Sequence, residues 1–178
     1  MNNLIWVTRQ FVHVDRVACP WLIKNFIDKE AQFIFLPKED INDFVTKTSA
    51  IPYDTGTGVE LDHYEKSGEK YCTFDALIEK YQLGNNSALK KLREVVRAAD
   101  TDKMDTNPLA WALEAMASSA PLLGNSDHDA LEREFPLYDV LYTYFKREII
   151  LEKYKPEISL LKTRGERQDF IKNKLTEF

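Results

Sequence analysis

The greatest concentration of reactive side chains lies in the segment DRVACPWLI, where Asp15, Arg16 and Cys19 precede a proline and a tryptophan. Proline is tolerated chiefly in the first turn of a helix, so we expect a helix that begins near Val17 to Cys19, with Pro20 just inside it. Cys19 would then lie at a helix N-terminus, where the backbone dipole favours an anion and lowers the pKa of a thiol. The competing interpretation makes Cys19 a small buried apolar residue and Asp15 a helix cap.

Two of the three histidines lie beside acids in turn-like sequence, His63 in the segment ELDH and His128 in DHD. Asp100 falls near the C-terminal end of a predicted helix, where the dipole opposes a carboxylate, so either Arg97 or a bound cation would offset its charge. Imidazole and carboxylate ligands suit zinc, iron or manganese. We therefore predict that His63, Asp100 and His128 converge on one divalent transition metal, without an HExxH or paired CxxC motif. The alternative is three unrelated surface or capping residues.

Charged side chains at predicted strand ends form a second candidate site. Arg9 follows the apolar run LIWVT, and Asp54 follows a third predicted strand. Ligands of α/β sheets gather at the carboxyl ends of strands. We expect Arg9 and Arg16 to face one polar cleft together with Asp15 and Asp54, and to bind a small oxyanion through bidentate contacts.

Composition limits the class of protein. The chain has 178 residues, a formal net charge of -5 and a pI near 5.3, which fits one domain and argues against nucleic-acid binding. No apolar run approaches the roughly 18 residues of a membrane-spanning helix, and no basic-then-apolar leader is present. We expect a cytoplasmic protein whose two cysteines, Cys19 and Cys72, are free thiols. They are also the candidate catalytic residues of a thiol-dependent reductase.

The elements that must position these residues divide the chain into two parts. Strands are predicted at 4–8, 32–36 and 50–53, with helices at 20–28 and 41–46 between them. This alternation favours a small, mostly parallel sheet. Further helices are predicted to begin at Thr73, Ser87, Asn107 and about Asp127, followed by a charged segment from Glu157 to Phe178. Pro136 should kink or interrupt the fourth of these helices. The predicted fold is α/β (α+β), with the sheet of the N-terminal third packed against a helical C-terminal region.

Several motifs, in one order over about residues 5 to 146, resemble the ChrB-type chromate resistance family. They are WVTR at 6–9, DRVACPWLI at 15–23, IPYD at 51–54, His63 followed by CTFDA at 72–76, VRAADT at 96–101 and LYDVLY at 137–142. The resemblance implies a C-terminal chromate-resistance domain and a role in this bacterial stress response. Longer members place the domain after an amino-terminal segment and are described as chromate-responsive regulators. Since the chain begins directly at the first strand, we expect it to lack that segment and any repressor role.

The residues and the resemblance together support three hypotheses about function. We expect residues 1–152 to form the ChrB-type domain and residues 153–178 a helical C-terminal extension. The first function is a domain that binds or senses an oxyanion such as chromate or sulfate. The second is a metal- or thiol-dependent enzyme, of reductase or hydrolase type, that uses His63, Asp100 and His128 or the two cysteines. The third is a partner-binding module whose contact surface is the helical tail. The sequence leaves open whether the chain is an enzyme and whether it forms a homo-oligomer.

Overall fold

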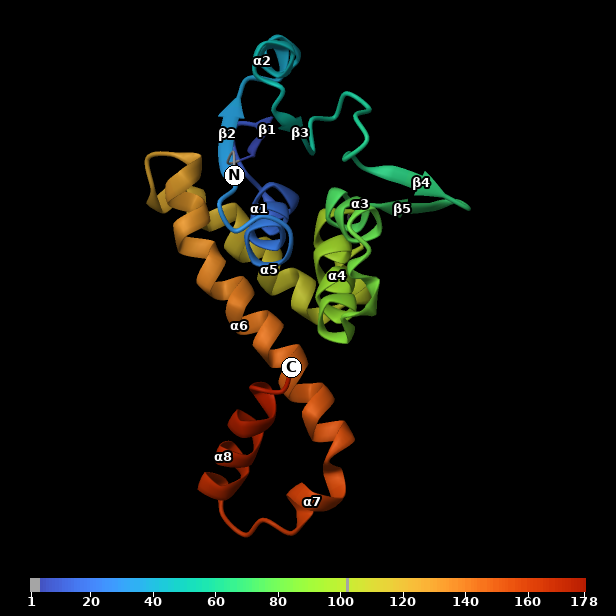
Figure 1. Cartoon of the computed structure of the whole chain (residues 1–178), viewed down its shortest axis with the longest axis vertical. Coiled ribbons are helices and arrows are strands. Elements are labelled where there is room, and N and C mark those ends of the chain that lie inside the picture. The colour runs from blue at the N-terminus through green and yellow to red at the C-terminus, as the bar shows by residue number, and fades with distance from the viewer. Residues whose placement is uncertain (1–3, 102) are drawn as a thin grey trace.

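The computed structural model describes residues 4–101 and 103–178 and combines a small sheet with a larger helical region (Figure 1). The strands are β1 (Ile5–Arg9), β2 (Gln32–Leu36), β3 (Ile51–Pro52), β4 (Tyr64–Lys66) and β5 (Glu69–Tyr71). The helices are α1 (Val14–Phe26), α2 (Ile41–Thr48), α3 (Thr73–Lys80), α4 (Ser87–Asp100), α5 (Pro108–Ser119), α6 (Asp127–Lys153), α7 (Lys155–Ser159) and α8 (Arg164–Leu175). The predicted fold class is confirmed.

The first three strands form a sheet of order β2-β1-β3, in which β1 runs parallel to both neighbours. Successive side chains of a strand face opposite sides of its sheet. Trp6 therefore enters the main core, while Val7 packs with the apolar residues of α2 on the other face (Figure 1). A strand buried on both faces is typical of parallel sheets and explains the apolar run that predicted it. The carboxyl end of β1 places Arg9 at the edge where ligands of such sheets bind.

Helix α1 begins earlier than expected and runs through its proline. It starts at Val14, after His13 in an extended conformation, and Pro20 lies in its interior. The proline costs typically about 3 kcal/mol in a helix interior. Nearly every residue from Val14 to Ile23 is buried, and each large apolar side chain contributes about 1.5–3 kcal/mol on burial. Burial of this segment therefore outweighs the cost of the proline. The predicted position of Cys19 at a helix N-terminus is wrong.

The starts of the later helices follow from their capping residues. Asn86 accepts a hydrogen bond from a backbone N–H in the first turn of α4, and Asn107 does the same for α5, which begins with Pro108. Ser126 caps α6 in the same way. An oxygen at the N-cap satisfies an N–H group that has no partner within the helix, and proline is favoured in the first turn. These helices therefore begin within a residue of the predicted positions.

Helix α6 is continuous through its proline, and α8 of the tail folds back on it. Pro136 lies inside α6 without ending it, so the predicted interruption is absent. The charged segment predicted from Glu157 to Phe178 is divided between α7, which follows the end of α6, and α8, which returns beside the C-terminal half of α6 (Figure 1). The expected boundary at residue 153 coincides with the end of α6 and stays a prediction. None of the helices in the described part of the chain, α6 included, is long and apolar enough to cross a membrane.

Glu134 is a buried acid on the core face of α6. Its side chain is buried, and neither carboxylate oxygen has a hydrogen-bond partner among residues 4–101 and 103–178. Burial raises the pKa of Glu134 to about 7 from an ordinary value of 4.5, because the interior does not solvate the charged form. The folded state therefore retains a proton that the unfolded state releases between these two values. It follows that this group lowers the stability of the fold as the pH rises from about 4.5 to about 7.

The variant Glu134→Gln should remove this pH dependence. Urea unfolding at pH 5 and at pH 8 gives the difference in free energy of unfolding between Glu134→Gln and the wild type. We expect this difference to shift in favour of the variant by about 2 kcal/mol between pH 5 and pH 8. Glu132→Gln, an exposed position on the same helix, is the matched control and should leave the pH profile unchanged. Identical pH profiles for the wild type and Glu134→Gln would contradict the prediction.

Candidate functional site

The loop after β3 brings several candidate residues to the carboxyl edge of the sheet. Asp62 organises this loop, since its carboxylate accepts the backbone N–H groups of residues 56–59 and the hydroxyl of Thr55. Although burial alone would raise it, the pKa of Asp62 is lowered by the N–H groups of Gly56 and Gly58. The loop is closed by the N–H of Asp54, which donates to the carbonyl of Leu61 at 2.8 Å. Its two ends are therefore held in fixed positions.

Asp54, at the start of this loop, is buried between two arginines. Arg9 Nη2 lies 3.3 Å from Asp54 Oδ1, and Arg16 Nη1 lies 3.1 Å from Oδ2. The Asp54 carbonyl oxygen accepts hydrogen bonds from Arg9 Nε at 3.0 Å and from the Thr8 hydroxyl at 3.2 Å. Burial raises the pKa of Asp54, and the guanidinium groups of Arg16 and Arg9 oppose that rise. The structure thus brings together three of the residues predicted to bind an oxyanion.

The backbone of Asp54 is strained in this position. Its φ angle is 45°, in the left-handed region that favours glycine. Residues held in that region cost about 1–3 kcal/mol and persist only where surrounding contacts determine them. The bonds from Thr8, Arg9 and Arg16 supply those contacts. Strain of this kind is common at binding sites, which supports a functional interpretation of the cluster.

Lys38 extends the positive charge of this edge. It follows β2 after a single proline and donates from Nζ to the carbonyl of Gly56 at 2.9 Å. Gly56 has a φ of 64°, and a Cβ atom built on it would lie 3.5 Å from both Arg9 Nη1 and Lys38 Nζ. Arg9 Nη1 and Lys38 Nζ thus converge on the space beside the Gly56 Cα atom. Sequence analysis missed Lys38, although the rule that selected Arg9 at a strand end applies equally to it.

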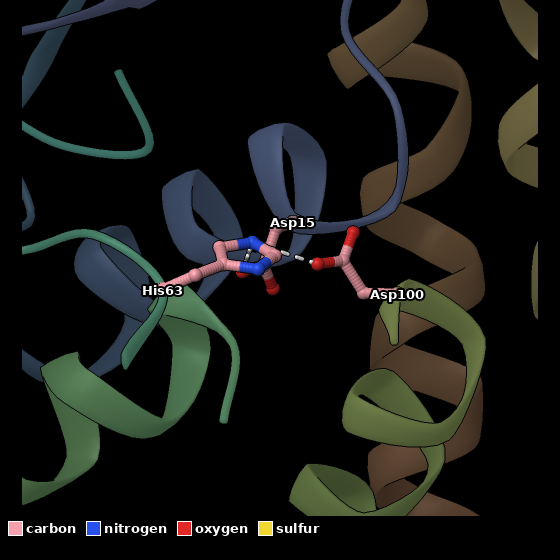
Figure 2. A group of neighbouring side chains, drawn as sticks. All are labelled: Asp15, His63 and Asp100. Carbon is pink, nitrogen blue, oxygen red and sulfur yellow. Dashed lines mark ion pairs between the residues drawn. The ribbon is translucent and has the colours of Figure 1, made fainter. Parts of the chain in front are cut away.

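A second cluster joins Asp15, His63 and Asp100, as Figure 2 shows. Nε2 of His63 lies 2.9 Å from Asp100 Oδ2, 3.5 Å from Asp15 Oδ2 and 3.6 Å from Asp54 Oδ1. The three residues come from the first turn of α1, the end of the loop and the last position of α4. One ligand atom from each lies within 4.8 Å of the others. An imidazole and two carboxylates in this arrangement could hold a divalent metal.

The electrostatics of this cluster are dominated by buried carboxylates. The carboxylates of Asp100 and Asp15 raise the pKa of His63 to about 10, so the ring of the free protein is an imidazolium at neutral pH. Burial, and then the charge of Asp100, raise the pKa of Asp15 to about 7. Asp15 also accepts the backbone N–H groups of Thr73 and Phe74, so it caps α3 and not its own helix. The cation that offsets Asp100 is His63.

The structure does not bring His128 to this cluster. Its neighbour Asp127 accepts the backbone N–H groups of Phe11 and Val12, at 3.0 and 2.8 Å, which anchors the start of α6 beside the loop between β1 and α1. This leaves His128 exposed on the side of β2, where its ring meets the edge of Phe35 at 5.1 Å. Asp15 occupies the place that sequence analysis assigned to His128. The spacing of helix starts along the chain could not show which side of α6 faces the cluster.

Both cysteines lie in the core. Burial raises the pKa of the Cys19 thiol and of the Cys72 thiol well above the ordinary value. Cys72 precedes α3, and its Sγ donates to Asp75 Oδ2 at 3.5 Å. Nucleophilic and redox chemistry requires a thiolate with access to substrate. A catalytic role for these cysteines stays a prediction to which these surroundings lend no support.

Together, these observations define a mixed α/β domain whose charged site lies at the carboxyl edge of a short parallel sheet and is enclosed by helices. Residues 6–145 match the model of the family described as "ChrB, C-terminal domain", and the chain belongs to this family. The resemblance predicted from its motifs is confirmed. Helices α7 and α8 lie outside the matched region.

One curated relative also matches most of the chain. Protein ChrB of Cupriavidus metallidurans is 30% identical over 142 residues, which cover 79% of this chain and 40% of that protein. The match therefore spans less than half of the relative's length. No solved structure matches the chain.

We expect the carboxylate of Asp62 to determine the loop geometry. Both of its oxygens accept N–H groups, so the amide of Asp62→Asn would turn a donor toward other donors. Hydrogen bonds to charged groups contribute about 1.5–3 kcal/mol each, and we expect Asp62→Asn to lose about 2 kcal/mol of stability in urea unfolding at pH 7. Glu60→Gln, in the same loop and exposed, should lose less than about 0.5 kcal/mol. An equal effect of the two substitutions would show that Asp62 has no special role.

Proposed function

We propose that this domain binds a tetrahedral oxyanion of the chromate or sulfate class at the carboxyl edge of the β2-β1-β3 sheet. Membership of the ChrB family supports an association with chromate resistance. The observation that carries the proposal is the convergence of Arg9 Nη1 and Lys38 Nζ on the space above Gly56. An oxyanion placed there would accept charge-assisted hydrogen bonds from both side chains.

The neighbouring contacts prepare Arg9 for this role. Arg9 donates hydrogen bonds from Nε to the carbonyl oxygen of Asp54 and from Nη2 to its carboxylate. Within residues 4–101 and 103–178, Arg9 donates hydrogen bonds from Nε and Nη2 alone, and its Nη1 lies 3.5 Å from the position of a Cβ atom built on Gly56. A guanidinium that is already oriented loses little side-chain entropy when a ligand binds, which favours affinity. Asp54 thus fixes the direction in which Arg9 presents its remaining donors.

The local charge also suits an anion. The chain is acidic overall, with a net charge of -5, yet three cationic side chains gather at this edge, where Asp62 is occupied by the backbone N–H groups of its own loop. The three are Arg9 and Arg16, both on Asp54, and Lys38 beside them. Cationic side chains gathered at one place can attract an oxyanion even to an acidic protein. The absence of a side chain at Gly56 leaves room for the ligand between Arg9 and Lys38.

A sensing role would follow from the contacts of Arg16. This residue joins Asp54 to the carbonyl of Phe11, which accepts from Arg16 Nη2 at 3.0 Å. The N–H of Phe11 in turn donates to Asp127 at the start of α6. An anion bound at Arg9 Nη1 would change the charge balance around Asp54, and through Arg16 and Phe11 it would affect contacts at the starts of both α1 and α6. Binding with transmission to helices has more support than thiol-dependent catalysis, because both thiols are buried and burial raises their pKa values.

Calorimetric titration with sulfate and with chromate tests the proposal. We expect the wild type to bind one anion and Lys38→Met to bind it about tenfold more weakly, since one charge-assisted hydrogen bond is lost. Arg9→Ala and Arg16→Ala should each lose about 1–3 kcal/mol of binding free energy. The effect of Arg16→Ala is indirect, because Arg16 holds Asp54, which orients Arg9. Lys47→Met, an exposed lysine of α2, is the control for net charge and should bind as the wild type does.

Gly56→Ala supplies an independent steric test. Its methyl group would fill the point that lies 3.5 Å from both cationic nitrogens, so we expect anion binding to be lost while Arg9 and Lys38 remain. The variant is compared with the wild type by circular dichroism, because a φ of 64° strains alanine. Absence of binding by the wild type, or unchanged affinity in both Arg9→Ala and Lys38→Met, would refute the oxyanion site.

A further inference from the structure

Oxyanion binding does not explain the second cluster, since this cluster consists of two carboxylates and one imidazole. We propose that Asp15, His63 and Asp100 bind one divalent first-row transition metal ion. The proposal concerns a ligand of opposite charge and does not depend on the oxyanion site.

The geometry provides three ligands from three separate elements. Figure 2 shows the carboxylates of Asp15, on α1, and of Asp100, at the end of α4, beside the His63 ring. One donor atom from each residue lies within 4.8 Å of the others. Metal–ligand bonds of about 2.0–2.2 Å for zinc place neighbouring ligand atoms of one ion at separations within that limit. Small side-chain adjustments would suffice for coordination.

Unpaired oxygen atoms provide an independent indication of a ligand. The Asp15 side chain is 1% exposed, and its Oδ1 has no hydrogen-bond partner within residues 4–101 and 103–178. Asp100 Oδ2 lies 2.9 Å from His63 Nε2 but accepts no directed hydrogen bond from the same part of the chain. A buried acceptor without a partner costs about 1–3 kcal/mol, and more when it is charged. A metal ion bound at the cluster would give the Asp15 carboxylate a further partner and would replace the His63 imidazolium beside Asp100 Oδ2.

The pairing of arginines with buried carboxylates also supports a cation site at Asp15 and Asp100. Asp54 is held by Arg9 and Arg16, and the buried Asp75 is held by Arg97 and Arg93. Asp15 and Asp100, by contrast, contact no arginine or lysine side chain in the described part of the chain and share a half-exposed histidine. Buried charges are usually paired or coordinate a metal. A divalent cation would balance the two carboxylates with the imidazole in its neutral, ligating form.

Outer contacts hold the proposed ligands in position. Asp15 Oδ2 accepts the backbone N–H groups of Thr73 and Phe74, which orients its carboxylate and leaves Oδ1 unpaired. Such second contacts typically orient metal ligands and tune affinity. One nitrogen and two carboxylate oxygens suit zinc, manganese or iron(II) better than soft metals that prefer thiolates. Asp54 Oδ1, 3.6 Å from His63 Nε2, lies at the border of the two sites.

Metal titration of the full-length chain tests the inference. Chelator-treated protein is titrated with Co²⁺, followed by visible absorption, and then with competing Zn²⁺; bound metal is counted by elemental analysis after dialysis. We expect one equivalent of metal in the wild type. His63→Ala and Asp100→Asn should each weaken binding at least about tenfold, the lower end of the losses seen when even indirect contacts to a metal are removed. His128→Ala, which removes an exposed histidine outside the cluster, should bind as the wild type does.

Asp15→Asn is a less direct test, because Asp15 also caps α3. His63→Ala leaves the cap of α3 in place, but it removes the cation beside Asp15 and Asp100, so its stability must be checked as well. Circular dichroism melts of each variant show that the fold is retained. Less than stoichiometric binding by the wild type, wild-type affinity in His63→Ala, or an equal loss in His128→Ala would each overturn the proposal.

Discussion

The arrangement of the site depends on buried carboxylates that are paired with cations from other elements. Asp54, Asp75 and Asp15 are all buried, and each contacts groups distant in the sequence. Removing one partner of a buried ion pair leaves an uncompensated charge and typically costs about 3–5 kcal/mol. The relative positions of the sheet, α1, α3 and α4 are therefore restricted by charge pairing as well as by apolar packing.

Two of these pairings explain how Asp100 reaches His63. Asp15 caps the N-terminus of α3 and so attaches α3 to α1. Asp75, in the first turn of α3, is bonded by Arg97 of α4, with Arg97 Nε 2.8 Å from Asp75 Oδ2. Helix α4 is thereby oriented with its last residue, Asp100, directed at the cluster. The helix dipole disfavours a carboxylate at this end, and the nearby imidazole supplies the compensating charge.

The two proposed ligands have opposite charges and adjacent sites. Asp54 separates them, since it faces Arg9 and Arg16 on one side and His63 on the other. A change in the charge on either side alters the electrostatic free energy of Asp54, which gives a physical route for coupling between a bound cation and a bound anion. Such coupling would suit the anion-binding role that we propose for this domain, which belongs to a family associated with chromate resistance.

Local sequence determined the three strands of the parallel sheet, most helix starts and the family, because apolar periodicity, capping residues and motifs act over a few residues; the hairpin of β4 and β5 was not predicted. It also identified Arg9, Arg16, Asp54, His63 and Asp100 as polar residues at the ends of elements. Tertiary structure alone decided the start of α1, where burial of the whole segment outweighs the proline at position 20. It also decided that Asp15 and not His128 joins His63, since α3 supplies partners to Asp15 while Asp127 anchors α6 elsewhere. Which side chains meet depends on how helices pack and rotate against one another, and that depends on contacts between residues far apart in the chain.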